Sequence, residues 1–139
     1  MAFREKVAWA AFVTTLLIWG AYFAVVVTDT GAAHSVRMFW LFIGATVAQA
    51  VLMGTATAIW AIRAPGEANA RPDERDRAVS RRATGVAYLV LVLGVMAVIA
   101  GLHMGLHGPG TIFALIGAFI LAEVARFGAQ AIGYRRESA

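Results

Sequence analysis

Hydrophobic residues fall into four long runs, and polar residues gather between them. The runs cover about residues 7–27, 38–62, 84–107 and 111–132. At a rise of about 1.5 Å per residue, each run is long enough to cross a hydrocarbon core of about 30 Å as an α-helix. Short turns join the first run to the second and the third to the fourth, which predicts antiparallel neighbours. We therefore expect an all-α, integral membrane antiparallel four-helix bundle that forms a single transmembrane domain over residues 1–139.

The linker 63–83 is the longest polar segment, and it sets the predicted orientation. It carries six arginines: Arg63, Arg71, Arg75, Arg77, Arg81 and Arg82. The N-terminal tail adds two basic residues and the chain from Arg126 onward adds three, whereas Arg37 stands alone at the opposite side. Basic loops are retained in the cytoplasm. The linker is therefore predicted to be cytoplasmic, with both termini on the same side (N-in/C-in).

Composition supports a membrane protein rather than a soluble one. The 139 residues are 60% hydrophobic and only 14% charged. The net charge of +4 lies beside the hydrophobic runs, which favours the lipid bilayer as partner and argues against nucleic acid. Without cysteine there is no disulfide and no thiolate ligand or nucleophile. The first run is about twice as long as a signal-peptide core, so we expect it to be a retained span. We expect the protein to lie in the bacterial inner membrane.

Turn and capping residues punctuate the linker. Pro65, Gly66 and Pro72 predict helix breaks, and Asp73 is placed to cap a helix that leads into the third span. The charged segment consists of Asp73, Glu74, Arg75, Asp76 and Arg77. We interpret this segment as a solvated helix start that enforces topology, since acids are favoured in a first turn. A protein-docking site is the alternative. Ser35 is the predicted N-cap of the second span.

Small residues recur every four positions on three of the predicted helices. The stripes are Ala50, Gly54 and Ala58; Ala97, Gly101 and Gly105; and Gly110, Ala114, Ala118 and Ala122. Such stripes let helix backbones approach closely. This matters because lipid supplies no hydrophobic driving force for helices to associate. We expect the first stripe to face the bundle, and the last to mediate a homo-oligomer or a tight contact within the bundle.

Residues 72–92, together with a fourth span that ends in residues 122–136, resemble a family of uncharacterised small bacterial and archaeal membrane proteins. Members share four spans and an Asp-Glu-Arg-Asp type segment before the third span. The resemblance covers most of the chain and implies the same fold, but no established activity. Members are often encoded beside small helix-turn-helix regulators, so the resemblance implies a cytoplasmic regulator protein as partner and a signalling or immunity-like role.

All three histidines fall at the predicted non-cytoplasmic end. His103 and His107 are four residues apart, which on a helix places both imidazoles on one face. His34, in the first turn, could supply a third ligand, and Asp29 or Met104 could complete the shell. Such a set suits Zn or Cu, or haem. The alternative is that the imidazoles lie at a wet interface and donate to free carbonyls at a helix end.

Two polar residues lie inside the predicted spans and are candidates for function. Glu123 has Arg126 three residues later, which favours a structural ion pair over a proton carrier. Gln49 suits either an interhelical hydrogen bond or a transport pathway.

We therefore expect a non-catalytic sensing, signalling or protective module with a periplasmic-side His metal site. The alternatives are a small proton-coupled transporter that uses Glu123 and Gln49, and a haem-binding redox protein. An enzyme is the least supported class.

Overall fold

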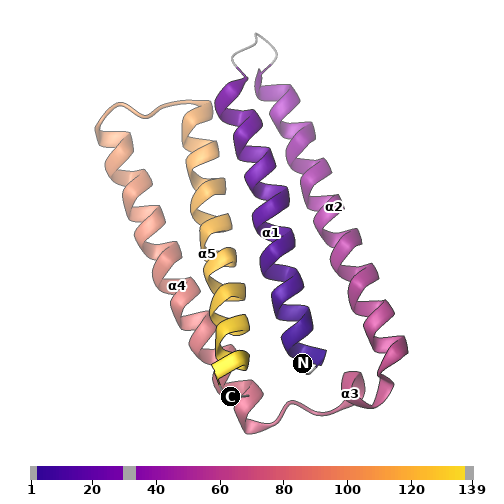
Figure 1. The fold of residues 1–139 in the computed structure, drawn as a ribbon. Helices are drawn as coiled ribbons and strands as arrows, with labels where there is room; N and C mark the ends of the chain where they lie inside the picture. The colour runs from indigo at the N-terminus through magenta and orange to yellow at the C-terminus, as the bar shows by residue number, and fades with distance from the viewer. Residues whose placement is uncertain (1–2, 30–33, 137–139) are drawn as a thin grey trace. The chain divides into compact units, whose positions relative to one another are not determined.

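The computed structural model describes residues 3–29 and 34–136. Its helices, shown in Figure 1, are α1 (Phe3–Thr28), α2 (His34–Arg63), α3 (Pro65–Asn69), α4 (Glu74–His103) and α5 (Pro109–Arg136). The part of the chain that is described contains no strand. The predicted all-α fold is confirmed.

The four long helices are apolar enough to cross a membrane. They contain 26, 30, 30 and 28 residues, and each is longer than the span predicted from its hydrophobic run. The difference lies at the polar ends, where helix continues past the apolar stretch. In α4, for example, the arginine-rich residues 74–83 belong to the same helix as the apolar residues that follow.

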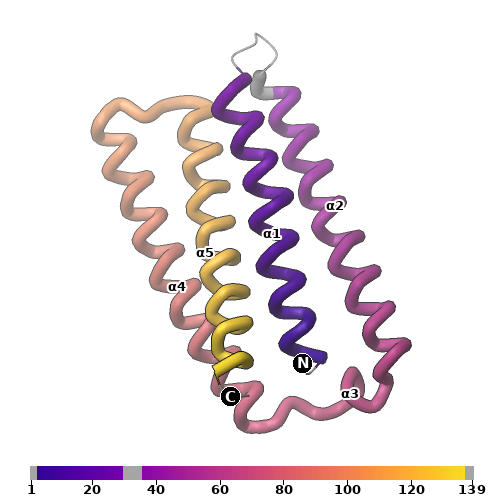
Figure 2. The backbone as a smooth tube through the Cα atoms, viewed as in Figure 1, coloured from indigo at the N-terminus to yellow at the C-terminus, as the bar shows by residue number. Residues whose placement is uncertain are grey.

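The chain divides into two compact units, residues 1–71 and 72–139, and each contains one helical hairpin. The first unit pairs α1 with α2 and adds the short α3, and the second pairs α4 with α5. Figure 2 shows that the two long helices of each unit run antiparallel. Each hairpin is described by itself below.

Aromatic rings and charged ends hold the first hairpin together. The ring of Phe42 on α2 lies 5.6 Å from Trp19 and 6.3 Å from Tyr22, both on α1. Nearer the turn, Arg37 forms an ion pair with Asp29. The positive charge of Arg37, the single basic residue predicted on that side, therefore lies against an acid of its own hairpin.

The other end of the first hairpin is closed by α3. The Phe3 backbone N–H donates to the Glu67 carboxylate at 3.0 Å, and the Arg4 guanidinium donates to the Ala70 carbonyl at 3.0 Å. The first N–H groups of a helix have no intrahelical acceptor, and a carboxylate there is also favoured by the helix dipole. The polar linker thus satisfies the start of α1.

Close backbone approach holds the second hairpin together. A Cβ atom built on Gly94 would lie 2.7 Å from the Cβ of Ala118, and one built on Gly133 would lie 2.9 Å from a methyl of Val79. Both contacts have the same antiparallel register, so α4 and α5 run in contact over most of their length. Ala118, at 5% exposure, and Ala122 are buried, so this small-residue stripe packs within the chain.

The other two stripes do not form the helix contacts of their own hairpins. Ala50, Gly54 and Ala58 are exposed, and a Cβ on Gly54 would meet nothing within 4 Å. Within the first hairpin this stripe does not contact α1, because α2 meets α1 through Phe42 and Gln49. The expectation that the stripe faces the bundle stays a prediction. On α4 the packing face passes through Gly94 rather than the exposed Ala97.

These environments predict opposite effects for the same substitution at two glycines. Gly54→Ala adds a methyl in open space and should leave stability unchanged or raise it by up to about 1 kcal/mol, through helix propensity. Gly94→Ala must displace Ala118 and should destabilise the protein by roughly 1–3 kcal/mol despite the same propensity gain. Thermal unfolding in detergent measures both. A Gly94 variant as stable as the Gly54 variant would contradict the close α4–α5 contact.

Candidate functional site

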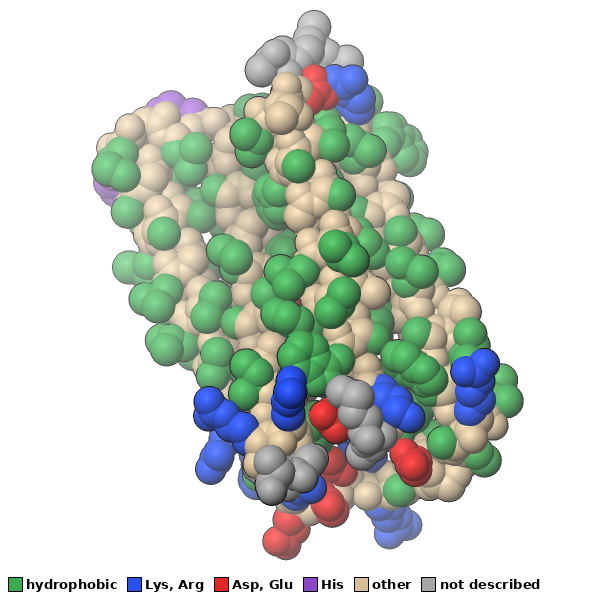
Figure 3. All heavy atoms as spheres, in the orientation of Figure 1, with side chains coloured by type: hydrophobic (Ala, Val, Ile, Leu, Met, Phe, Trp, Pro, Cys, Tyr) green, Lys and Arg blue, Asp and Glu red, His purple; other side chains and the backbone are tan. Residues whose placement is uncertain are grey.

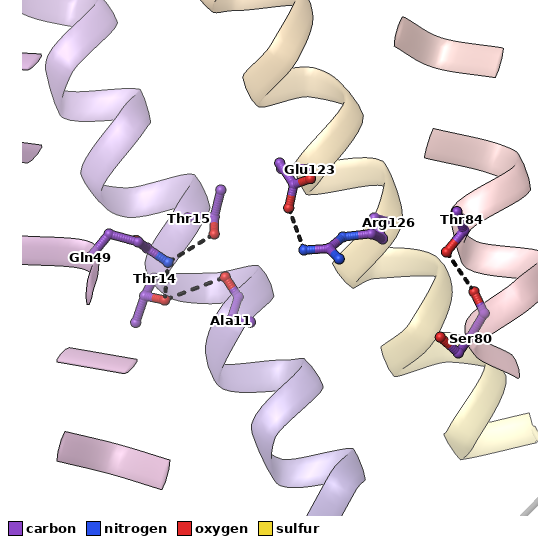
Figure 4. Close-up of polar contacts among 8 residues, drawn as sticks. All are labelled: Ala11, Thr14, Thr15, Gln49, Ser80, Thr84, Glu123 and Arg126. Atoms are coloured by element: carbon purple, nitrogen blue, oxygen red, sulfur yellow. Dashed lines mark hydrogen bonds and ion pairs between the residues drawn. The ribbon is translucent and has the colours of Figure 1, made fainter. Parts of the chain in front are cut away.

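Gln49 links the two helices of the first hairpin near the middle of α2. Its side-chain amide donates to the hydroxyls of Thr14 at 3.1 Å and Thr15 at 3.0 Å, both on α1 (Figure 4). The Thr14 hydroxyl donates its own proton to the Ala10 carbonyl at 2.7 Å, which leaves its oxygen free to accept. The interhelical hydrogen bond predicted for Gln49 is thus present. The Gln49 Oε1 atom is buried and has no partner within the described residues.

Glu123 and Arg126 form an ion pair on α5. The guanidinium lies 2.5 Å from the carboxylate and 4.5 Å from the centre of the Phe127 ring. Figure 4 shows the two side chains pointing toward each other along one helix. The pair is partly buried, and the Arg126 Nε atom has no partner among the described residues.

The register of the second hairpin gives the depth of this pair. Since Gly94 lies against Ala118 and Val79 lies against Gly133, Glu123 is level with residue 89 of α4. The apolar stretch of α4 begins at Gly85. At about 1.5 Å per residue, the carboxylate therefore lies only about one turn inside the arginine-rich end of the span.

The histidines near the second turn do not share a helical face. Helix α4 ends at His103, Gly105 has a φ of +100°, and the Leu106 N–H donates to the Gly101 carbonyl at 2.9 Å. This is the Schellman arrangement, in which a glycine in the left-handed region ends a helix. His107 therefore lies in the turn, and the expectation that His103 and His107 lie on one face of a helix is wrong.

His103 uses one ring nitrogen at this helix end. Its Nδ1 lies 2.9 Å from the Ile99 carbonyl, and because a carbonyl only accepts, Nδ1 carries the proton. A hydrogen bond of this kind is expected if the imidazole lies at a wet interface and donates to a carbonyl near a helix end. It leaves Nε2 available to another partner. Metal-binding histidines also commonly donate their second nitrogen to a carbonyl, so the hydrogen bond fits either role.

No three described His, Asp or Glu side chains lie close enough together to hold a metal ion. The side chain of His34, at the start of α2, lies outside the described part of the structure, as does that of Ser35. Of the additional ligands considered, Asp29 binds Arg37 and Met104 is exposed at the end of α4. The site formed by His34, His103 and His107 stays a prediction.

The charged segment 73–77 has a local structural role. Asp73 caps α4 and Asp76 completes a capping box, because each carboxylate accepts from the other residue's backbone N–H, at 2.7 and 3.3 Å. Arg75 donates to the Tyr134 carbonyl at the end of α5, at 3.2 Å. Glu74 and Arg77 are exposed. The cap predicted for Asp73 is confirmed.

Sequence reasoning missed the hydrogen-bond partners of Gln49. Thr14 and Thr15 are the polar residues at the matching depth of α1, and pairing the two apolar runs about their turn would have brought them level with Gln49. It also missed Glu67, whose position two residues after Pro65 gave no sign that it would reach the start of α1.

Comparison with family models, curated proteins and solved structures finds no match for this chain. The resemblance to small four-span membrane proteins stays a hypothesis. In its Asp-Glu-Arg-Asp segment, residues 73–76, Asp73 and Asp76 form the capping box and Arg75 contacts the end of α5.

Gln49→Leu should lower the free energy of unfolding by about 0.6 kcal/mol, and by at most roughly 1.7 kcal/mol, as interhelical hydrogen bonds do in membranes. Thr46→Val is the matched control, since the exposed Thr46 hydroxyl bonds, among the described residues, only to the Phe42 carbonyl of its own helix. Unfolding in mixed detergent compares them. Equal effects of the two substitutions would show that the contact with Thr14 and Thr15 does not hold the hairpin.

The predicted histidine site should give about one Zn or Cu per purified chain, or the visible Soret band of haem. His107→Ala should remove most of this content and abolish the rise in thermal midpoint that added metal produces. Elemental analysis, visible spectra and thermal shifts test the prediction. Equal, substoichiometric metal in the wild type and the variant, with no haem spectrum, would leave the histidines with the interfacial role.

Proposed function

We propose that this chain is a non-catalytic, multi-pass module of the bacterial inner membrane that acts in sensing, signalling or protection. One observation carries the proposal. The two polar side chains that are candidates for function within the spans are both engaged in structural contacts, since Glu123 pairs with Arg126 and the Gln49 amide bonds to Thr14 and Thr15. A carboxylate that neutralises its neighbour is a poor proton carrier, because protonation would leave the cation uncompensated.

The charge distribution supports an N-in/C-in orientation for this module. Basic residues gather at the ends where α1 and α4 begin and α2 and α5 end, and Figure 3 shows blue side chains concentrated there. At the other end of the first hairpin, Asp29 offsets the charge of Arg37. Positive residues favour the cytoplasmic side, and Arg37 is the single Lys or Arg predicted on the opposite side. A regulator partner on that side and a homo-oligomer stay predictions.

A small proton-coupled transporter is the second candidate, and a different observation favours it. Gln49 Oε1 and Arg126 Nε are buried and have no partner in the part of the chain described. Unsatisfied polar atoms inside a span are costly, and water or a polar substrate would satisfy them. The two candidates assign different roles to Glu123. In the proposed module it neutralises Arg126, whereas in a transporter it would carry protons.

Glu123→Gln separates these candidates. In the proposed module the variant leaves Arg126 unpaired and should lose about 1 kcal/mol of stability, between the values for exposed and buried pairs. The double variant E123R/R126E should recover part of the loss. Unfolding in detergent measures both, and Glu74→Gln is the control because Glu74 is exposed.

Proton flux in liposomes completes the test. Wild-type protein and the Glu123 variant should both match empty liposomes under an imposed proton gradient. Flux that the wild type supports and the folded Glu123→Gln protein lacks would contradict the proposed module and establish the transporter.

A further inference from the structure

We propose that the arginine-rich start of α4 binds the headgroup phosphates of anionic phospholipids through Arg77 and Arg81, with Tyr88 at the adjoining membrane interface. This surface is independent of the polar contacts on which the proposed function rests. All three side chains are exposed, and Tyr88 is 70% exposed. They belong to one continuous helix that passes from polar linker into apolar span.

The packing of the second hairpin fixes the direction in which these residues point. Val79 and Ala83 are buried, and Val79 lies against Gly133 of α5. At 3.6 residues per turn, Arg77, Arg81 and Tyr88 fall together on a face well away from this buried stripe. Arg77 and Arg81 lie one turn from each other, about 6 Å along the axis. This spacing lets two guanidinium groups share or neighbour one phosphate.

The acids nearby do not neutralise these arginines. Asp73 and Asp76 use their carboxylates in the capping box that begins α4, and Glu74, three residues before Arg77, is exposed and forms no ion pair with it among the described residues. Within residues 3–29 and 34–136, neither Arg77 nor Arg81 has an ion-pair or hydrogen-bond partner for its guanidinium. Arg75, which is engaged with the Tyr134 carbonyl, is not part of the proposed surface. The two charges are therefore available to a ligand.

The depth of these residues along the membrane-spanning helix indicates that the ligand is a lipid. Arg81 lies about one turn before the apolar stretch that begins at Gly85, and Tyr88 lies just inside it. Helical side chains tilt toward the helix N-terminus, so the Tyr88 hydroxyl leans toward the arginine level. Phosphates of the leaflet occupy this level beside any helix that crosses there. Juxtamembrane arginines recognise anionic headgroups in this way.

The experiment measures lipid retention by the full chain. Protein in neutral detergent is mixed with phosphatidylglycerol or phosphatidylcholine, and bound lipid is counted by native mass spectrometry. We expect preferential retention of phosphatidylglycerol and, for R77Q/R81Q, affinity lower by about fivefold per arginine. The control R63Q/R71Q removes the same charge from exposed positions of the linker and should retain the lipid. Equal thermal midpoints show that each variant is folded.

Three outcomes would overturn the proposal. These are equal retention of the two lipids by the wild type, equal losses in the two double variants, and displacement of phosphatidylglycerol by millimolar inorganic phosphate. The last result would assign the surface to free phosphate rather than to a lipid. Tyr88→Leu supplies a further readout, since loss of the interfacial hydroxyl should weaken phosphatidylglycerol retention without changing net charge.

Discussion

In a bilayer, apolar side chains gain little by leaving lipid for a neighbouring helix, so close packing and polar contacts must hold the helices together. The two hairpins meet this constraint differently. In the second, Gly94 lets the backbone of α4 approach Ala118 so closely that a single methyl group would overlap. In the first, Gln49 bonds to hydroxyls on α1, and Phe42 packs against Trp19 and Tyr22. A small-residue contact depends on shape and an amide contact on satisfying polar groups, so substitutions in the two hairpins have different physical consequences.

The same constraint applies at the helix ends, where backbone groups have no intrahelical partner. The polar linker supplies partners to both hairpins. Glu67 accepts from the Phe3 N–H at the start of α1, and Arg75 donates to the Tyr134 carbonyl near the end of α5. The linker that is predicted to set the topology through its charges therefore also completes the hydrogen bonding of the helices it joins. Glu67 and Arg75 of the linker are thus used at helix ends, whereas the charges of Arg77 and Arg81 are exposed.

Local features of this fold could be predicted from sequence, whereas the facing of each helix could not. The four spans follow from apolar length, and the Asp73 cap follows from an acid placed after Pro72. The stripe through Gly54 looked like that through Ala118, yet only the latter packs within its own hairpin. Both lipid and a neighbouring helix accept an apolar face, so the sequence pattern does not separate the two cases. The Glu123–Arg126 pair was predictable because both partners are on one helix, while Gln49 needed the helix register to find Thr14 and Thr15. The end of α4 at His103 was also predictable, from Gly105, but the apolar pattern continued past it.

The ion pair of α5 poses a question that packing does not answer. Glu123 and Arg126 lie on one helix, so their contact does not join α5 to α4, and two apolar residues would enter lipid at lower cost. Depth offers a physical explanation. The pair lies about one turn inside the apolar stretch, near the interface, where a charge inside a span costs less than at its centre. We interpret Arg126 as an anchor for the depth of α5 and Glu123 as the group that limits the cost of its charge. In this interpretation the pair positions the hairpin in the membrane, which is a structural role that needs no proton transfer at Glu123.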